Sequence, residues 1–139
     1  MADDGPAPAD DRAGDGEREQ LVLEPDLASV AVARAFVRAR CHALGMGEDS
    51  CDTAVLLTSE TVTNAFTHGR SEARIRVLAR PGGLLVEVAD DNSRHPQRQD
   101  DDPDALDGRG LSIVDLLARS WGVRDDPYGK TVWFEVPAP

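Results

Sequence analysis

Residues 56–68 read LLTSETVTNAFTH, and this stretch carries the most information about the fold. Glu60, Asn64 and His68 are spaced four residues apart, so on a helix they lie in one line along one face. A carboxylate and an amide one turn apart suit a hard cation and a nucleophile, because an amide oxygen coordinates Mg²⁺ and a carboxylate accepts a proton. The alternative is an ordinary solvated helix face, which the apolar residues on both sides of the line disfavour.

The chain before this stretch predicts a short strand at 21–23, an N-cap at Asp26 and a helix over 27–44 that ends at Gly45. The apolar residues of that helix recur with a helical period. They are Leu27, Val30, Ala33, Phe36, Val37, Cys41 and Leu44.

The second helix contains the quoted stretch, and we expect Ser50 or Asp49 to be its N-cap. After the second helix, apolar residues alternate with arginines over 73–80, which predicts a strand with one face buried. Residues 81–83 read PGG, a hairpin turn, and 84–89 form the returning strand.

Residues 90–107 are rich in aspartate and lack any pattern, and a loop of that length in a compact domain is either functional or a misassignment. A third helix is expected at 111–119, and a closing strand pair at 121–124 and 130–136. The predicted fold class is α/β: a two-layer sandwich of about three helices on a mixed, mostly antiparallel sheet.

The chain has 139 residues, which suits one domain with a tail. We expect a disordered acidic tail at 1–18 and a folded domain at 19–137. The tail lacks large apolar residues, so it cannot offset the entropy of ordering. It acts either as a solubilising segment or as an acidic contact arm for a basic partner.

Acidic residues outnumber basic ones by 26 to 15, a net charge of −11 that argues against a nucleic-acid partner. No transmembrane run and no signal peptide are visible, so the expected compartment is the cytoplasm, with no membrane partner. The two cysteines, Cys41 and Cys51, fit buried reduced thiols rather than a metal site.

Two further motifs carry candidate chemistry. Asp90 ends a strand, where its carboxylate either accepts a hydrogen bond from an amine such as that of adenine or forms an Asx turn. Gly108, Arg109 and Gly110 open the third helix, where backbone N–H groups either approach an anion or form a plain hinge and cap. Residues 129–131 read GKT, but the first P-loop glycine is missing and a strand follows, which excludes a P-loop.

The order of these motifs resembles the GHKL ATPase superfamily, which includes the gyrase, mismatch-repair, heat-shock chaperone and histidine-kinase ATPases. It is most similar to the stand-alone bacterial anti-sigma factor serine/threonine kinases. Segment 56–68 is similar to the N-box of that branch, and segment 108–114, GRGLSIV, to its second glycine box. The resemblance covers about 21–136 and implies the histidine-kinase-type ATPase fold.

The resemblance also implies ATP and Mg²⁺ as cofactors. Asn64 would hold Mg²⁺, and Glu60 would be the catalytic base. Asp90 would accept a hydrogen bond from the adenine amine, and Thr131 would support Asp90 in this contact. Asn92 stands where the family has a glycine, and asparagine tolerates positive φ best after glycine. The remaining nucleotide-binding residues that the resemblance implies are Asn92, Gly108, Arg109, Gly110 and Leu111.

The function implied is an ATP-binding anti-sigma factor with serine/threonine kinase activity. It would phosphorylate an anti-anti-sigma protein of the STAS type, bind a sigma factor and regulate bacterial transcription by partner switching; a homodimer is consistent with the family. One alternative is a non-catalytic ATP-binding regulator that sequesters a sigma factor or another signalling protein. Another is an α/β domain that binds no nucleotide. A histidine kinase is disfavoured, because no dimerisation helix with a phospho-accepting histidine is present.

Overall fold

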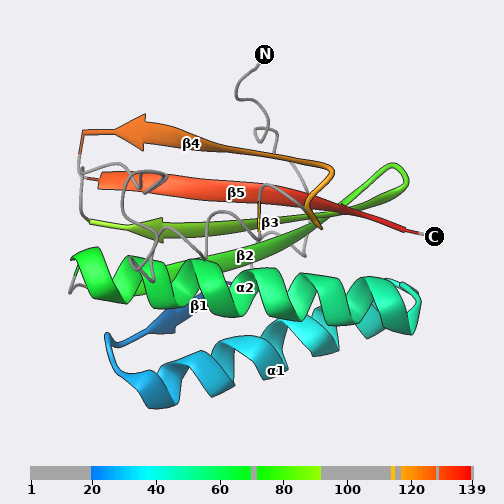
Figure 1. Cartoon of the computed structure of the whole chain (residues 1–139), viewed down its shortest axis with the longest axis horizontal. Helices are drawn as coiled ribbons and strands as arrows, with labels where there is room; N and C mark the ends of the chain where they lie inside the picture. The colour runs from blue at the N-terminus through cyan, green and yellow to red at the C-terminus, as the bar shows by residue number, and fades with distance from the viewer. Residues whose placement is uncertain (1–19, 70–71, 92–113, 115–116, 128, 139) are drawn as a thin grey trace.

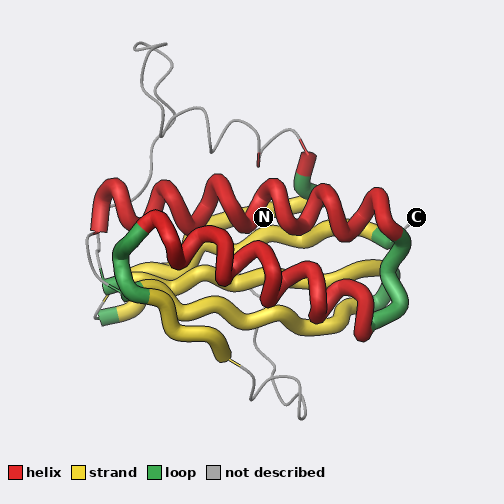
Figure 2. Tube along the Cα trace, turned by 90° about the horizontal axis from the view of Figure 1, so that it is seen from below, coloured by secondary structure: helices red, strands yellow, loops and turns green. Residues whose placement is uncertain are grey.

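The computed structural model describes residues 20–69, 72–91, 114, 117–127 and 129–138, so the predicted tail lies outside it. The elements in chain order are β1 (Gln20–Leu23), α1 (Leu27–Ala43), α2 (Glu48–Gly69), β2 (Ala73–Arg80), β3 (Gly83–Asp90), β4 (Ser120–Asp126) and β5 (Gly129–Pro137). The two helices lie side by side on one face of the sheet (Figures 1 and 2), which confirms the predicted two-layer α/β architecture.

The five described strands form one sheet in the order β1-β2-β3-β5-β4, and every pairing among them is antiparallel. The expectation of a mixed sheet is therefore wrong for this part of the chain. The reason is the connection between β1 and β2. It contains two helices, and the chain reverses direction three times, from β1 to α1, from α1 to α2 and from α2 to β2, so β2 returns antiparallel to β1 (Figure 1). Strand β5 then inserts between β3 and β4, antiparallel to both (Figure 1).

Most of the third helix, expected at 111–119, lies outside the described residues. Val114 is helical and buried, and the N–H of Ala118 donates to the carbonyl of Val114 at 2.9 Å. This contact corresponds to one helical turn within the predicted range.

Helix α1 begins as predicted, because Asp26 has extended backbone angles and its Oδ1 accepts the N–H of Ala28 at 2.8 Å. The middle of the apolar stripe is buried, at Val30, Ala33, Val37 and Cys41. Leu27 and Leu44 were expected in the same stripe, but Leu27 is 78% exposed and Leu44 is also exposed. Both leucines lie at the ends of the helix, where no other described element packs over the apolar face and covers their side chains.

Helix α2 begins at Glu48, so the expected N-cap at Ser50 or Asp49 is wrong, since both lie inside the first turn. The Ser50 hydroxyl instead donates to the carbonyl of Pro137 at 3.0 Å, which ties the start of α2 to the end of β5. Glu48 and Asp49 in this turn complement the positive end of the helix dipole. Among the described residues, no helix combines the length and the hydropathy needed to cross a membrane.

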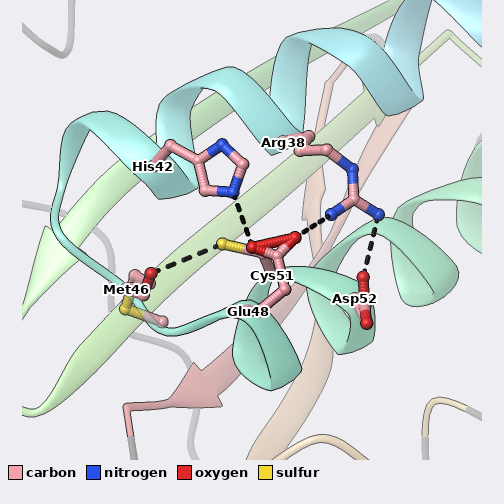
Figure 3. Close-up of polar contacts among 6 residues, drawn as sticks. All are labelled: Arg38, His42, Met46, Glu48, Cys51 and Asp52. Atoms are coloured by element: carbon pink, nitrogen blue, oxygen red, sulfur yellow. Dashed lines mark hydrogen bonds and ion pairs between the residues drawn. The ribbon is translucent and has the colours of Figure 1, made fainter.

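The corner between the two helices is held by ion pairs (Figure 3). Arg38 on α1 contacts Glu48 at 3.2 Å and Asp52 at 3.0 Å, and His42 Nε2 lies 3.2 Å from Glu48 Oε1. Beneath this exposed layer Cys41 and Cys51 are free and buried, as predicted.

The β2–β3 hairpin turns at Pro81 and Gly82, as predicted, with Gly82 at a φ of 75° that favours glycine. Alternate residues of β2 are buried under the helices, whereas its arginines point to the opposite face. Among the described residues, the core between sheet and helices is mainly aliphatic, and Phe134 on β5 is its largest fully buried side chain. The partly buried Phe36 and Phe66 pack against it.

The opposite face of the sheet is organised around Glu87, whose side chain is only 4% exposed. Its Oε1 accepts from Arg76 at 2.6 and 3.0 Å, and its Oε2 lies 3.4 Å from Arg124. Two cations from β2 and β4 therefore neutralise one buried carboxylate on β3.

Candidate functional site

Helix α2 carries the polar line predicted from the sequence, and the structure buries part of it. Asn64 is 7% exposed, whereas Glu60, one turn earlier, is partly exposed. The side chain of His68 lies outside the described residues. Because residues four apart stack on one helix face, Glu60 and Asn64 point in the same direction. The solvated-face alternative is therefore wrong for Asn64.

The carboxamide oxygen Oδ1 of Asn64 is buried and accepts no hydrogen bond within the part of the chain that the structure describes. Leaving a buried polar atom without a hydrogen bond destabilises the folded protein by about 1–3 kcal/mol. The oxygen is therefore a candidate for contact with a ligand. An amide oxygen is a ligand that Mg²⁺ accepts. Thr58 Oγ1 shares this property but lies on a different face of the helix.

The described residues contain no group of three His, Cys, Asp or Glu side chains that could hold a metal ion. A cation at Asn64 would therefore need water or bound phosphate for its other ligands. This requirement fits Mg²⁺, which keeps several waters and binds proteins together with substrate phosphates.

Asp90 lies at the end of β3 and is 2% exposed. It follows Val86 and Val88 in the strand alternation, so its side chain lies on the helix-covered face of the sheet. Lys130, directly opposite on β5, is equally buried, and its Nζ lies 3.0 Å from both Asp90 carboxylate oxygens. The two side chains form a buried ion pair.

Gly129 permits the close approach of β5 to the end of β3. A Cβ atom at this position would stand 2.0 Å from the carbonyl oxygen of Asp90 and 2.7 Å from the Cα of Asp91. Both are backbone atoms, so the clash could be relieved only by a shift of the strands. The absent side chain is therefore a condition for the contact between Asp90 and Lys130.

Thr131 does not support Asp90 in the expected way. It is paired with Ala89, so its side chain lies on the opposite face of the sheet from that of Asp90. Lys130 occupies the position beside Asp90 instead. The correction follows from strand register, since a shift of one residue exchanges the two faces.

Three elements bring Asn64, Asp90 and Lys130 to the same end of the molecule. Helix α2 and strand β3 end there, and strand β5 begins there (Figure 1, left). Asn64 lies in the last two turns of α2, Asp90 is the last residue of β3, and Lys130 is the second residue of β5. Residues far apart in the sequence are therefore gathered at one edge between the two layers.

The remaining predicted site residues fall outside the described part of the chain. They are Asn92, Gly108, Arg109, Gly110 and Leu111.

Sequence reasoning missed Lys130, which it considered only as part of a failed P-loop. A signal was present, because Lys130 is the single lysine among 15 basic residues and lies near the start of a mostly apolar strand. A charged residue in such a strand needs a buried partner. Its partner, however, depends on the pairing of β3 with β5, which the sequence does not display.

The sequence from residue 23 to residue 136 matches the family model of the histidine kinase-like ATPase domain. None of the curated proteins shows significant sequence similarity to the chain.

Several solved structures share the fold. One, of the RsbU and RsbW domains of Rv1364c from Mycobacterium tuberculosis, is 20% identical with a TM-score of 0.65, and the match covers 86% of this chain and 32% of that one. The histidine kinase domain of the blue-light activated histidine kinase from Erythrobacter litoralis EL346 is 21% identical with a TM-score of 0.51, covering 81% and 60%. A second structure of that kinase is 24% identical with a TM-score of 0.52, covering 84% and 42%.

The chain thus spans about a third of the length of the mycobacterial protein in that structure, and at these identities the likeness concerns the fold alone. The family match covers most of the chain and agrees with the observed arrangement of helices and sheet. The chain therefore belongs to the histidine kinase-like ATPase domain family.

Proposed function

We propose that the domain binds Mg-ATP at the end of the sheet where α2 and β3 end, and transfers the γ-phosphoryl group to a serine or threonine of an anti-anti-sigma protein. Membership of an ATPase domain family supports ATP as the ligand. The observation that carries the proposal is the buried Oδ1 of Asn64, which lies one helical turn beyond Glu60 and has no hydrogen-bond partner among the described residues.

Asn64 holds Mg²⁺ in this proposal, and the ion supplies neutralisation of the phosphate charge. Glu60 is partly exposed, so a hydroxyl group of a protein substrate can reach it. Glu60 accepts the proton of that hydroxyl as its oxygen bonds to the γ-phosphorus, while the bond from the γ-phosphorus to the bridging oxygen breaks and ADP leaves. Phosphoryl transfer depends mainly on positioning and charge neutralisation, so few residues suffice.

The adenine amine would donate to Asp90, the buried carboxylate at the end of β3. Successive backbone N–H groups and the Arg109 guanidinium would contact the phosphates. The residues proposed for this part of the site are Asn92, Gly108, Arg109, Gly110 and Leu111.

The proposed partners are a sigma factor and a STAS-type anti-anti-sigma protein, which exchange according to phosphorylation state. The likeness of segments 56–68 and 108–114 to the anti-sigma factor kinases supports this role, and the fold shared with the structure of RsbU and RsbW domains is compatible with it. A homodimer and a cytoplasmic location in a bacterium belong to the same proposal.

Titration calorimetry of Mg-ATP tests the nucleotide site. We expect binding by the native protein and at least about a tenfold loss of affinity in Asn64→Ala, because the variant lacks the metal ligand. Thr63→Ala, an exposed neighbour on the same helix, is the matched control and should bind as the native protein does. Failure of the native protein to bind at millimolar Mg-ATP would contradict the proposal.

A phosphoryl-transfer assay with γ-labelled ATP and a STAS-type protein then tests the chemistry. Glu60→Gln should retain ATP binding and lose transfer, since the amide accepts no proton. The same assay distinguishes a second function, that of a non-catalytic ATP-binding regulator. It would be supported if the native protein binds ATP and partner proteins but transfers no phosphate.

A further inference from the structure

The face of the sheet that points away from the helices is richer in positive charge than the chain as a whole. Both helices lie on one face of the sheet (Figure 2), and among the described elements no helix lies on the other, which we call the open face. The side chains of alternate strand residues point to the open face. The charged ones that the structure describes there are four arginines and two glutamates: Arg74, Arg76, Arg80, Arg124, Glu87 and Glu135. In the whole chain, by contrast, acidic residues outnumber basic ones by 26 to 15.

Two of these arginines share one carboxylate, which leaves a positive charge over. Arg76 binds Glu87 Oε1 at 2.6 and 3.0 Å, whereas both terminal nitrogens of Arg124 lie 3.4 Å from Glu87 Oε2. A strong hydrogen bond between a guanidinium and a carboxylate is shorter, about 2.7–2.9 Å. Arg124 has no closer partner among the described residues, and its side chain is 38% exposed. Its guanidinium can therefore bind a second carboxylate from the solvent side.

A segment of opposite charge is attached to the edge of this sheet. Residues 1–19 contain seven acidic and two basic side chains, and they lead into β1 at Gln20, which pairs with Arg76 on β2. The strand order places β1 and β4 at opposite edges, four strand spacings or about 19 Å apart. An extended chain spans about 3.3 Å per residue, so at least about six residues are needed to reach Arg124 from Gln20. Asp10 and Asp11 lie beyond that limit, and so they can reach it.

We propose that the acidic segment 1–19 binds the open face of its own sheet, with Asp10 and Asp11 contacting the guanidinium of Arg124. A single exposed ion pair contributes little. Because the segment belongs to the same chain, however, its local concentration at the sheet is on the order of millimolar, and two adjacent carboxylates meet one guanidinium. Asn64 lies on the helix-covered side of the sheet, so this contact is independent of the proposed nucleotide site.

Chemical crosslinking of the whole chain tests the contact. Lys130, the single lysine of the native chain, is buried, so Arg124→Lys introduces the one exposed lysine amine while keeping the charge. A water-soluble carbodiimide activates a carboxylate, and an amine in contact with it then forms an amide bond as the carbodiimide leaves as a urea. Peptide mass spectrometry should find the introduced amine joined to Asp10 or Asp11. Circular dichroism must show that the variant is folded as the native protein is.

Arg34→Lys is the matched control, since it places the same amine on the exposed surface of α1, on the helix-covered side of the sheet. The yield of crosslinks to residues 1–19 should be at least about fivefold lower from this position than from Arg124→Lys, because both positions are within reach of the segment but only one has the proposed contact. For Arg124→Lys, about 0.5 M sodium chloride should remove most of the product, because salt screens the attraction between exposed charges.

Three outcomes would overturn the inference. The contact does not exist if the folded Arg124→Lys variant gives no crosslink to residues 1–19. Equal yields from Arg34→Lys and Arg124→Lys would mean random encounters of a tethered segment. Crosslinks found only in products of twice the chain mass would assign the open face to the acidic segment of a second copy. None of these outcomes bears on the binding of Mg-ATP, which the titration of Asn64→Ala tests separately.

Discussion

At the scale of single residues, burial changes the chemistry of Cys41. Its thiol is fully buried between α1 and α2, and its pKa is raised from 9.0 to about 12. Desolvation is the largest cause of this shift, the neighbouring Cys51 contributes in the same direction, and Arg38 opposes it. The folded protein therefore keeps the Cys41 proton at a pH where the unfolded chain releases it.

This difference predicts that the free energy of unfolding falls as the pH rises from about 9 towards 12. The contribution is fully present below the pKa of the unfolded thiol and falls by at most about 1.4 kcal/mol per pH unit above it. Urea unfolding at pH 8 and pH 10 measures the change. Cys41→Ala should show a smaller fall over the same interval, and an identical fall in both proteins would refute the role of this thiol.

At the scale of elements, the two helices begin in different ways. The carboxylate of Asp26 caps α1 by accepting the N–H of Ala28. Helix α2 begins at Glu48, and Cys51 donates its backbone N–H to the carbonyl of Gly47. The Ser50 hydroxyl donates to the carbonyl of Pro137 at the end of β5. A residue type that often caps helices therefore forms a tertiary hydrogen bond here instead.

Asp26→Ala should destabilise the protein by about 1 kcal/mol, because a helix N–H loses its acceptor. Asp49→Ala is the matched control, since Asp49 is an exposed aspartate in a first helical turn. It should cost only a few tenths of a kcal/mol, from the helix dipole alone. Equal losses for the two variants in chemical denaturation would argue against the assigned cap.

At the scale of the whole molecule, one aliphatic core joins both helices to the sheet. Leu57 on α2 is fully buried within it, while the adjacent Leu56 is 40% exposed. Substituting each leucine in turn therefore separates the stability that comes from core packing, which only Leu57 provides, from the effect on helix propensity, which is the same at both positions.

Leu57→Ala should lower the free energy of unfolding by about 2–5 kcal/mol, the range for a buried leucine that leaves a cavity. Leu56→Ala should cost less than about 1 kcal/mol, because its side chain is already partly in water. Urea unfolding followed by circular dichroism measures both. Similar losses would mean that the core does not extend to α2 as described.

Local physics made much of the fold predictable. The helical period of 27–44, the Asp26 cap, the alternation in 73–80 and the turn at 81–83 each depend on neighbouring residues, and the structure confirms all four elements. The polar line through Glu60 and Asn64 was visible for the same reason, since four-residue spacing alone places two side chains on one helix face.

Tertiary structure decided what depends on partners distant in sequence. The antiparallel order of the sheet follows from two helices between β1 and β2, and the register of β3 against β5 sets Lys130, not Thr131, beside Asp90. Helical and strand periods determine which face a side chain takes within its own element. They carry no information about which residue of another element it meets, because that is settled only when the layers pack and the strands pair.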